Sequence, residues 1–433
     1  MSPAVAGVVG IGVLLAFFFT GMPVAYVMAL VGLAGFAWII NPTAALNLLA
    51  RDIYSVFSSY GLTVIPLFVL MGQIAYNAGI SRRLYDCTYK VLGGIRGGLA
   101  AATVAACTAF GTVCGSSPAT AATMAVVGLP EMRRYGYGDA LAAGSVAAGG
   151  SLGMLMPPSV VLIVYGILTE QSIGRLFVAG IVPALYMTLW FLGAIWFHCR
   201  RHPEEGPPGE RFGWRERLWA LTELWETLLV FGLVMAGLFW GVFTPTEAGA
   251  VGAALILGLA LVRRQISWQG VVQSFYETVR TSCMVLLLIA GAVIFGHFLA
   301  VTRIPFEMAG WVEGLNLPPW AMMACIVGIY LVGGCFIDAL ALVMLTVPIF
   351  TPIVVNLGYD PVWFGVIIVL VTQMGVITPP VGINVYVVSG IAREIPLGVI
   401  FRGVMPFLVA LILGTLSLIA FPRIVTFLPD LMF

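Results

Sequence analysis

Long apolar segments separated by short polar turns run through nearly the whole chain. A helix that crosses a bilayer needs about 20 apolar residues, and the pattern predicts such helices at 4–20, 22–40, 59–77, 177–197, 216–242, 245–262, 281–300 and 397–421. Four other apolar segments are interrupted near their middle, at 97–130, 138–168, 319–350 and 361–392. The sequence therefore predicts an all-α polytopic membrane protein in which broken helices accompany continuous ones.

The first two interrupted segments are broken by glycine, serine and proline. A short polar run at 114–118 divides 97–130 into two short helices and predicts a re-entrant hairpin, with Ser117 as the cap of the second helix and Pro118 at its first position. In 138–168 the helix stops and restarts at Pro157-Pro158. Broken backbone inside a membrane persists only where protein buries it or where it lines a wet cavity. Both breaks are therefore candidate functional elements.

Landmarks of the first half recur in the second half at one constant spacing. Four pairs share this spacing: Pro23 and Pro245, Pro130 and Pro352, Gly136-Tyr137 and Gly358-Tyr359, and Pro157-Pro158 and Pro379-Pro380. We therefore predict a single integral membrane domain, 1–433, built from a duplicated unit. The predicted parts are repeat 1 at about 22–199 (hairpin 97–130, broken helix 138–168), a linker at 200–215, and repeat 2 at about 245–421 (hairpin 319–350, broken helix 361–392).

The composition limits the class of protein. Of the 433 residues, 61% are hydrophobic and 9% are charged, whereas a soluble domain has about 25% charged residues. A net charge of +1 gives no sign of nucleic-acid binding, and neither the seven cysteines nor the three histidines show metal spacing. A membrane enzyme is disfavoured because no nucleophile with a base and no paired acids are evident. A passive channel is disfavoured because it would gain nothing from two occluding hairpins.

Positive charges predict how the chain lies in the membrane, because Lys and Arg gather on the cytoplasmic side. With the N-terminus outside, 16 of the 20 Lys and Arg residues lie inside, and four lie outside: Arg51, Arg175, Arg303 and Arg423. Arg96 and Arg133 then anchor the first hairpin inside, while the second hairpin lies in a stretch without Lys or Arg and enters from outside. The two repeats are therefore predicted to be inverted, as in secondary transporters with discontinuous helices.

Two segments next to the hairpins, 80–94 and 266–277, mix charged and apolar residues. Either they are amphipathic helices that lie along the inner membrane surface, or they are ordinary loops that carry the positive charge of the cytoplasmic side. The sequence leaves both interpretations open.

Four stretches resemble one known family: TGMPVAYVMAL at 20–30, GSSPATAATMA at 115–125, GGSLGMLMPPS at 149–159 and TQMGVITPPVGINVYV at 372–387. They are similar to the large membrane subunit of tripartite ATP-independent periplasmic (TRAP) transporters, and the likeness extends over essentially the whole chain. The resemblance implies an elevator-type secondary transporter in a bacterial inner membrane that imports organic acids with sodium. One departure is Asp338 in the second hairpin opposite Ser116 in the first, so the two half-sites need not be chemically equal.

The resemblance also implies partners. A soluble periplasmic binding protein would deliver the substrate, and a small membrane subunit would accompany the large one. We expect that subunit to be a separate chain, because neither end of this sequence carries such an extension. Sodium is the only metal expected, as coupling ion, and no cofactor, catalytic residue or nucleic-acid partner is expected. A self-sufficient sodium-coupled carboxylate symporter of the same fold group is the alternative, since the same sites would serve it.

The first hairpin and the first broken helix predict one sodium site. Hard cations prefer oxygen ligands, and a broken helix exposes carbonyl and hydroxyl oxygens. The predicted residues are Gly115, Ser116, Ser117, Gly150, Gly153 and Met156. The alternative is a packing interface of small residues between close helices.

The second hairpin and the second broken helix predict another sodium site. Its predicted residues are Gly334, Asp338, Thr372, Gly375 and Thr378. Asp338 is the only charged residue between Glu313 and Asp360, and an ionisable group in such apolar surroundings indicates function. Alternatively, Asp338 caps the helix that it begins.

The substrate is expected between the two cation sites. The predicted residues around it are Pro157, Pro158, Ser159, Pro379, Pro380 and Asn384. There a carboxylate would meet the N-termini of the restarting half-helices. No arginine lies in either break, so helix dipoles, the bound cations and water would balance its charge. His297, in another helix, is either a proton relay or a packed, hydrogen-bonded residue.

Overall fold

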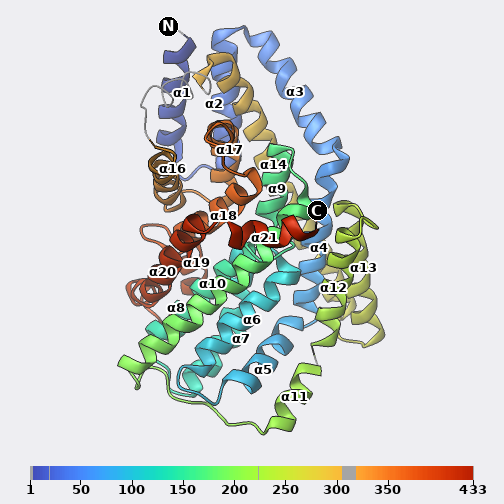
Figure 1. Ribbon diagram of the computed structural model, residues 1–433. Coiled ribbons are helices and arrows are strands. Elements are labelled where there is room, and N and C mark those ends of the chain that lie inside the picture. The colour runs from blue at the N-terminus through green and yellow to red at the C-terminus, as the bar shows by residue number, and fades with distance from the viewer. Residues whose placement is uncertain (1–2, 19, 223, 305–317, 433) are drawn as a thin grey trace.

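The structure is a computed structural model that describes residues 3–18, 20–222, 224–304 and 318–432. Across these ranges every regular element is a helix (Figure 1), which confirms the predicted all-α class. Six described helices are long and apolar enough to cross a membrane: Tyr60–Asn77, Ile173–Arg201, Pro245–Val262, Trp268–Thr302, Ala339–Asn356 and Leu397–Ala420.

The first half of the chain contains the first hairpin and the first broken helix. In chain order its elements are α1 (Pro3–Phe18), α2 (Val24–Ile39), α3 (Pro42–Ser58), η1 (Tyr60–Thr63), α4 (Val64–Asn77), α5 (Ile80–Leu92), α6 (Gly98–Cys114), α7 (Ser117–Arg134), α8 (Asp139–Ser151), η2 (Leu152–Met154), α9 (Val160–Thr169) and α10 (Ile173–Arg201). The arms of the hairpin are α6 and α7, and the parts of the broken helix are α8 and α9. The chain breaks at the expected places, beside Gly115 and at Pro157-Pro158.

The second half repeats much of this order. Its described elements are α11 (Trp214–Thr222), α12 (Trp225–Phe239), α13 (Pro245–Val262), α14 (Trp268–Thr302), α16 (Pro319–Gly334), α17 (Ala339–Asn356), α18 (Pro361–Ile377), α19 (Ile383–Ile391), α20 (Leu397–Ala420) and α21 (Arg423–Met432). The constant spacing that separates the proline pairs also separates the start of α7 from the start of α17, and the end of α7 from the end of α17. The starts of α8 and α18 are separated by the same spacing. This agreement supports the predicted duplication, while the inverted orientation of the units stays a prediction.

The structure corrects two details of the sequence interpretation. Most of 266–277 is neither a separate surface helix nor a loop, because α14 begins at Trp268 and runs without interruption to Thr302. The N-cap of α7 is Ser116 rather than Ser117, which is the first residue of the helix. The other charged segment, 80–94, does form a helix, α5, whose buried side packs against α6.

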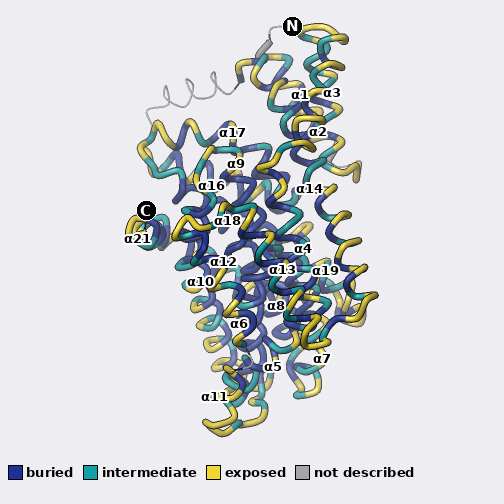
Figure 2. The backbone as a smooth tube through the Cα atoms, turned by 90° about the vertical axis from the view of Figure 1, so that its right-hand side faces the viewer, coloured by how far each residue is buried: buried dark blue, intermediate teal, exposed yellow. Residues whose placement is uncertain are grey.

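Helices that are buried on all sides form the centre of the molecule. Every residue of α8 from Leu141 to Ser151 is buried, and so is every residue of α18 from Val362 to Ile377. Figure 2 shows buried backbone concentrated in the middle of the molecule and exposed backbone at its outer helices and lower loops. A helix that is apolar all round is expected in such a position. The first parts of the two broken helices, α8 and α18, therefore form the core on which the hairpins rest.

The linker between α10 and α11, residues 202–213, follows the lower end of the first hairpin in Figure 1. The Gly206 carbonyl accepts a hydrogen bond from the Gly97 amide at 2.9 Å, and the Glu205 carbonyl accepts one from the Gly138 amide at 3.0 Å. These two bonds hold the polar linker against the starts of α6 and α8.

Candidate ion and substrate site

The tip of the first hairpin rests on the break of the first broken helix. Gly115, which follows α6, has a φ of +62°, a left-handed conformation that favours glycine. A Cβ at Gly115 would collide with the Pro158 carbonyl oxygen. In addition, the Val160 amide donates a hydrogen bond to the Gly115 carbonyl at 3.5 Å. The start of α7 and the start of α9 therefore lie side by side.

Three residues predicted for the first sodium site meet at this tip: Gly115, Ser116 and Gly153. Met156, also predicted for it, lies against Gly111, one turn before the tip. A Cβ at Gly153 would lie 3.2 Å from the Ser116 carbonyl oxygen. That carbonyl already accepts hydrogen bonds from the Thr120 amide and hydroxyl, at 3.1 and 2.8 Å. The half-exposed Ser116 hydroxyl is therefore the more available oxygen, and the residue types at this tip fit a hard cation.

The other two predicted residues have different surroundings. Gly150 packs on α7, because a Cβ added to Gly150 would lie 2.5 Å from the Ala121 Cβ. This contact fits the alternative interpretation, a packing interface of small residues between close helices. The buried Ser117 hydroxyl donates a hydrogen bond to Asn384 Oδ1 at 2.9 Å. Asn384 in turn donates from Nδ2 to the Ala147 carbonyl at 2.9 Å. Ser117 therefore joins the first hairpin to the start of α19.

The second hairpin meets the second broken helix in a similar way. α16 ends at Gly334, and a Cβ at Gly375 of α18 would collide with the Gly334 backbone. The Val381 amide also donates a hydrogen bond to the Cys335 carbonyl at 3.3 Å. Gly375 occupies the position in the second repeat that Gly153 occupies in the first. A glycine at this position of each repeat lets the hairpin approach its broken helix closely.

Asp338 lies at the tip of the second hairpin as the N-cap of α17. Its Oδ2 accepts a hydrogen bond from the Leu340 amide at 3.0 Å, which confirms the capping role. The residue as a whole is partly exposed. A role as cation ligand stays a prediction beside this structural role.

Thr372 and Thr378 use their hydroxyl protons within their own helix. The Thr372 hydroxyl donates to the Val369 carbonyl at 2.8 Å, and the Thr378 hydroxyl donates to the Met374 carbonyl at 2.5 Å. Lone pairs on both oxygens are left for a cation. In the described part of the chain no hydrogen bond joins either threonine to Asp338.

A cavity of about 270 Å³ opens between the first hairpin tip and the helices α4 and α14. Ser116, Val160 and Leu340 line it, and these residues lie at the starts of α7, α9 and α17. The N-terminal end of a helix carries partial positive charge and favours an anion. Three helix starts at one cavity therefore make it suitable for a carboxylate.

Four polar side chains of this cavity were not predicted from the sequence: Gln73, Tyr76, Thr123 and Thr281. Gln73 and Tyr76 come from α4, and Thr281 comes from α14. These helices are unbroken, so reasoning from the breaks missed them. Gln73 was the one available signal, because it is the only polar residue in the apolar run 64–75.

None of the six residues predicted around the substrate, all in the described part of the chain, lines this cavity. Pro157-Pro158 and Ser159 are buried behind the hairpin tip, and Ser159 immediately precedes the lining residue Val160. Asn384 is buried, whereas Pro379-Pro380 is exposed. The first break is thus enclosed by protein, while the second break is open.

His297 lies beside a buried carboxylate. Its Nε2 is 3.3 Å from Oδ2 of Asp52 on α3, and Asp52 is only 5% exposed. The His297 side chain is itself exposed, and within the described part of the chain no hydrogen bond joins it to Asp52 Oδ2. The structure therefore does not bear out the interpretation as a packed, hydrogen-bonded residue, and a role as proton relay stays a prediction.

Charged pairs link the two halves of the chain at both ends of the core. At one end Arg133 of α7 contacts Glu394. The Glu394 backbone amide, and after it the Arg133 guanidinium, hold the pKa of that carboxyl below its ordinary value. At the other end Arg175 of α10 lies 3.0 Å from Asp430 and 3.8 Å from Asp360. Both halves therefore contribute to one body.

Apolar helices, helix breaks in both halves and a cavity at the breaks together define a class, the polytopic helical membrane transporters. Within that class, the family model described as "Tripartite ATP-independent periplasmic transporter, DctM component" matches residues 11–424. The chain belongs to this family of TRAP transporter large permeases, which confirms the resemblance seen in the sequence.

Two relatives and one solved structure illustrate the match. The chain is 37% identical over 383 residues to the C4-dicarboxylate TRAP transporter large permease protein DctM of Pseudomonas aeruginosa. The matched region covers 88% of this chain and 89% of that protein. The chain is 34% identical over 415 residues to the sialic acid TRAP transporter large permease protein SiaM of Vibrio cholerae, with 95% and 96% covered. The YdaH transporter of Alcanivorax borkumensis has a similar fold, with a TM-score of 0.63 at 16% identity over 89% of this chain and 90% of that one.

Proposed function

We propose that this chain is the large membrane subunit of a sodium-coupled importer of an organic acid. It would lie in a bacterial inner membrane with its N-terminus in the periplasm, receive substrate from a periplasmic binding protein, and work with a small membrane subunit. Family membership supports the transport role, and the relatives named for C4-dicarboxylates and sialic acid support a carboxylate substrate. The cavity bounded by Ser116, Val160 and Leu340 is the observation that carries the proposal.

The charges around this cavity explain why a cation is needed. The starts of α7, α9 and α17 favour a carboxylate, but Asp338, two residues before the lining residue Leu340, repels it. The Ser116 hydroxyl and the Asp338 carboxylate offer oxygen ligands of the kind that hard cations prefer. Sodium, when bound, supplies positive charge that balances both Asp338 and the substrate. Substrate binding is then favourable only when the cations are in place, which is the thermodynamic basis of coupling.

Two cation positions follow from the two tips. The first would use oxygens of Gly115, Ser116, Gly153 and Met156, with Ser117 and Gly150 supporting the tip by packing. The second would use Gly334, Asp338, Thr372, Gly375 and Thr378. The substrate would lie between them, in the cavity that the starts of the half-helices line.

We further propose that the hairpins and broken helices move as one body against the remaining helices, in an elevator mechanism. The cavity lies at this boundary, between the first hairpin tip and the α4 and α14 helices. Gly72 of α4 also faces the hairpin tip closely, because a Cβ there would lie 3.1 Å from the Cys114 Cα. A close backbone contact at a glycine, with no side chain between the helices, suits sliding contact.

Uptake into liposomes tests the proposed function. The chain would be reconstituted with its candidate small subunit and offered a panel of carboxylates, with an inward gradient of sodium or of choline at equal ionic strength, and with or without the binding protein. We expect uptake of one class of acid only when sodium and the binding protein are both present.

The same assay separates the alternative. Sodium-driven uptake without the binding protein would identify a self-sufficient symporter and remove the proposed role of the partners. Uptake that proceeds equally in the choline gradient would contradict sodium coupling.

A further inference from the structure

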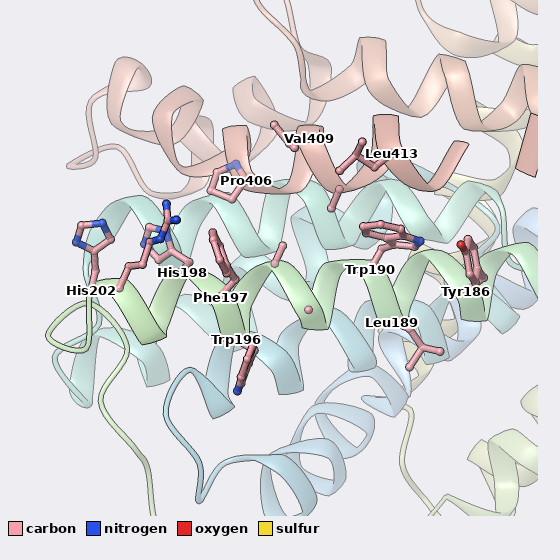
Figure 3. Close-up of a pocket in the computed structure, with 14 residues that line it drawn as sticks. Tyr186, Leu189, Trp190, Trp196, Phe197, His198, His202, Pro406, Val409 and Leu413 are labelled. Atoms are coloured by element: carbon pink, nitrogen blue, oxygen red, sulfur yellow. The ribbon is translucent and has the colours of Figure 1, made fainter. Parts of the chain in front are cut away.

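A wide groove lies away from the breaks, between α10 of the first half and α20 of the second (Figure 3). It has a volume of about 880 Å³, and its walls are mainly apolar, with Trp190 and Phe197 from α10 facing Val409 and Leu413 from α20. Leu189, Phe197 and Val409 are 65%, 51% and 55% exposed. An apolar groove of this size that opens on the outside of a membrane protein faces lipid rather than water.

One end of the groove is charged. His198, Arg201 and His202 line it there, at the end of α10. Both histidines have acidic partners, since His198 Nε2 lies 2.7 Å from Glu205 Oε2 and His202 Nδ1 lies 3.8 Å from Glu204 Oε1.

Arg201 is the arginine that lines this end of the groove. Its guanidinium lies over the Phe197 ring, 4.2 Å from the ring centre, and it has no carboxylate partner among the described residues. On α20, Arg402 is exposed and precedes the lining residue Pro406 by four positions, so both lie on one face of the helix. The groove thus combines a long apolar part with a cationic end, which is the complement of an anionic amphiphile.

We propose that this groove binds an anionic phospholipid of the cytoplasmic leaflet, with an acyl chain between α10 and α20 and the phosphate beside Arg201. The cationic end belongs to the region that the distribution of Lys and Arg assigns to the cytoplasmic side. Anionic lipids give that leaflet a negative surface potential, which attracts basic residues near the membrane. Because α10 and α20 come from different halves of the chain, the lipid would bridge the two units.

Native mass spectrometry of the purified complex with equal amounts of phosphatidylglycerol and phosphatidylcholine tests the proposal. We expect the wild-type chain to retain phosphatidylglycerol preferentially, and Arg201→Gln to reduce this preference about five-fold, the effect of one basic residue near an anionic surface. Arg200→Gln is the matched control, because Arg200 is the neighbour of Arg201 on α10 but does not itself line the groove. If both variants lose the preference for phosphatidylglycerol equally, the preference comes from general surface charge, and the proposed site is wrong.

A second variant tests the apolar part. Gly193 lines the groove, and a Cβ added there would meet no atom within 4 Å, so the side chain of Gly193→Leu would begin in open space and occupy the groove. We expect it to lose both lipids, whereas Gly232→Leu on α12, which is equally open, should lose neither. Unchanged lipid retention in Gly193→Leu would overturn the proposal. Loss of the small membrane subunit instead of lipid would also overturn it, by making the groove a protein interface.

Discussion

Ser116 and Ser117 are neighbours in the sequence, but they face different surroundings. Ser116 is half-exposed and lines the cavity, whereas Ser117 is 2% exposed and bonded to Asn384. Reasoning from the sequence treated both serines as sodium ligands, because the partner of Ser117 lies 267 residues away and no local pattern indicates it. Two substitutions therefore have different expected effects.

Ser117→Ala should act on stability. It leaves the buried Oδ1 of Asn384 without its donor, and a buried unsatisfied acceptor costs about 1–3 kcal/mol in the free energy of unfolding. We expect a lower Tm of the purified complex in sodium and in potassium alike. A double-mutant cycle with Asn384→Ala should show strong non-additivity, whereas additive effects would show that the two side chains are not coupled.

Ser116→Ala should act on sodium dependence instead. It removes the most available oxygen of the first tip, so we expect a several-fold rise in the sodium concentration for half-maximal uptake, with little change in Tm. Ser58→Ala, at the exposed end of α3, is a control for the same chemical change. If the sodium concentration for half-maximal uptake in Ser116→Ala stays at the wild-type value, the prediction of the first sodium site is wrong.

Glycine contacts position the helices at both breaks. Gly111 of the first hairpin faces Gly153, where a Cβ on Gly111 would lie 3.0 Å from the Gly153 Cα, and Gly334 of the second hairpin faces Gly375. In both places backbone meets backbone, so an added methyl group cannot be accommodated by a side-chain rotation. The position of each hairpin thus depends on these contacts.

Gly375→Ala should displace the second hairpin. The added methyl group collides with the Gly334 backbone, and overpacking of this kind costs about 1–3 kcal/mol. We expect a lower Tm and reduced uptake. Gly390→Ala, where a Cβ meets no atom within 4 Å, should leave both unchanged. Wild-type uptake and Tm in Gly375→Ala would show that the contact does not position the hairpin.

The breaks could be predicted from the sequence, because glycine and proline interrupt helices by their own backbone chemistry, as at Gly115 and Pro157-Pro158. The start of α14 could not be predicted from the sequence. The polar residues before Thr281 lie outside the apolar run, but they still belong to the same helix. The wall of the cavity formed by Gln73 and Thr281 was also missed, because it depends on how unbroken helices pack against the first hairpin.

At the scale of the whole molecule, the two halves interlock and do not form separate lobes. Ser117 of the first half binds Asn384 of the second in the core, and Arg133 contacts Glu394 at one end. The first parts of the two broken helices, α8 and α18, are buried inside this common body from Leu141 to Ser151 and from Val362 to Ile377. Any large movement must therefore carry parts of both halves together, as an elevator mechanism requires.

The predicted orientation can be tested with an impermeant thiol reagent. In a chain whose exposed Cys283 and Cys325 are replaced by serine, Leu357→Cys at the end of α17 should react from the periplasmic side. Glu204→Cys in the exposed linker should react only after the membrane is opened. Labelling of Leu357→Cys from the cytoplasmic side alone would show that the predicted orientation is reversed.

Sodium influx that depends on the substrate tests the central claim most directly, because it measures the coupling itself. Liposomes that contain this chain and the proposed small subunit would be loaded with potassium and a sodium-sensitive dye, and the proposed binding protein, carrying the acid identified by uptake, would be added outside. The account predicts that sodium influx rises with loaded binding protein, does not rise with empty binding protein, and needs more sodium in Ser116→Ala. Accumulation of the acid without sodium influx above the empty control would contradict it.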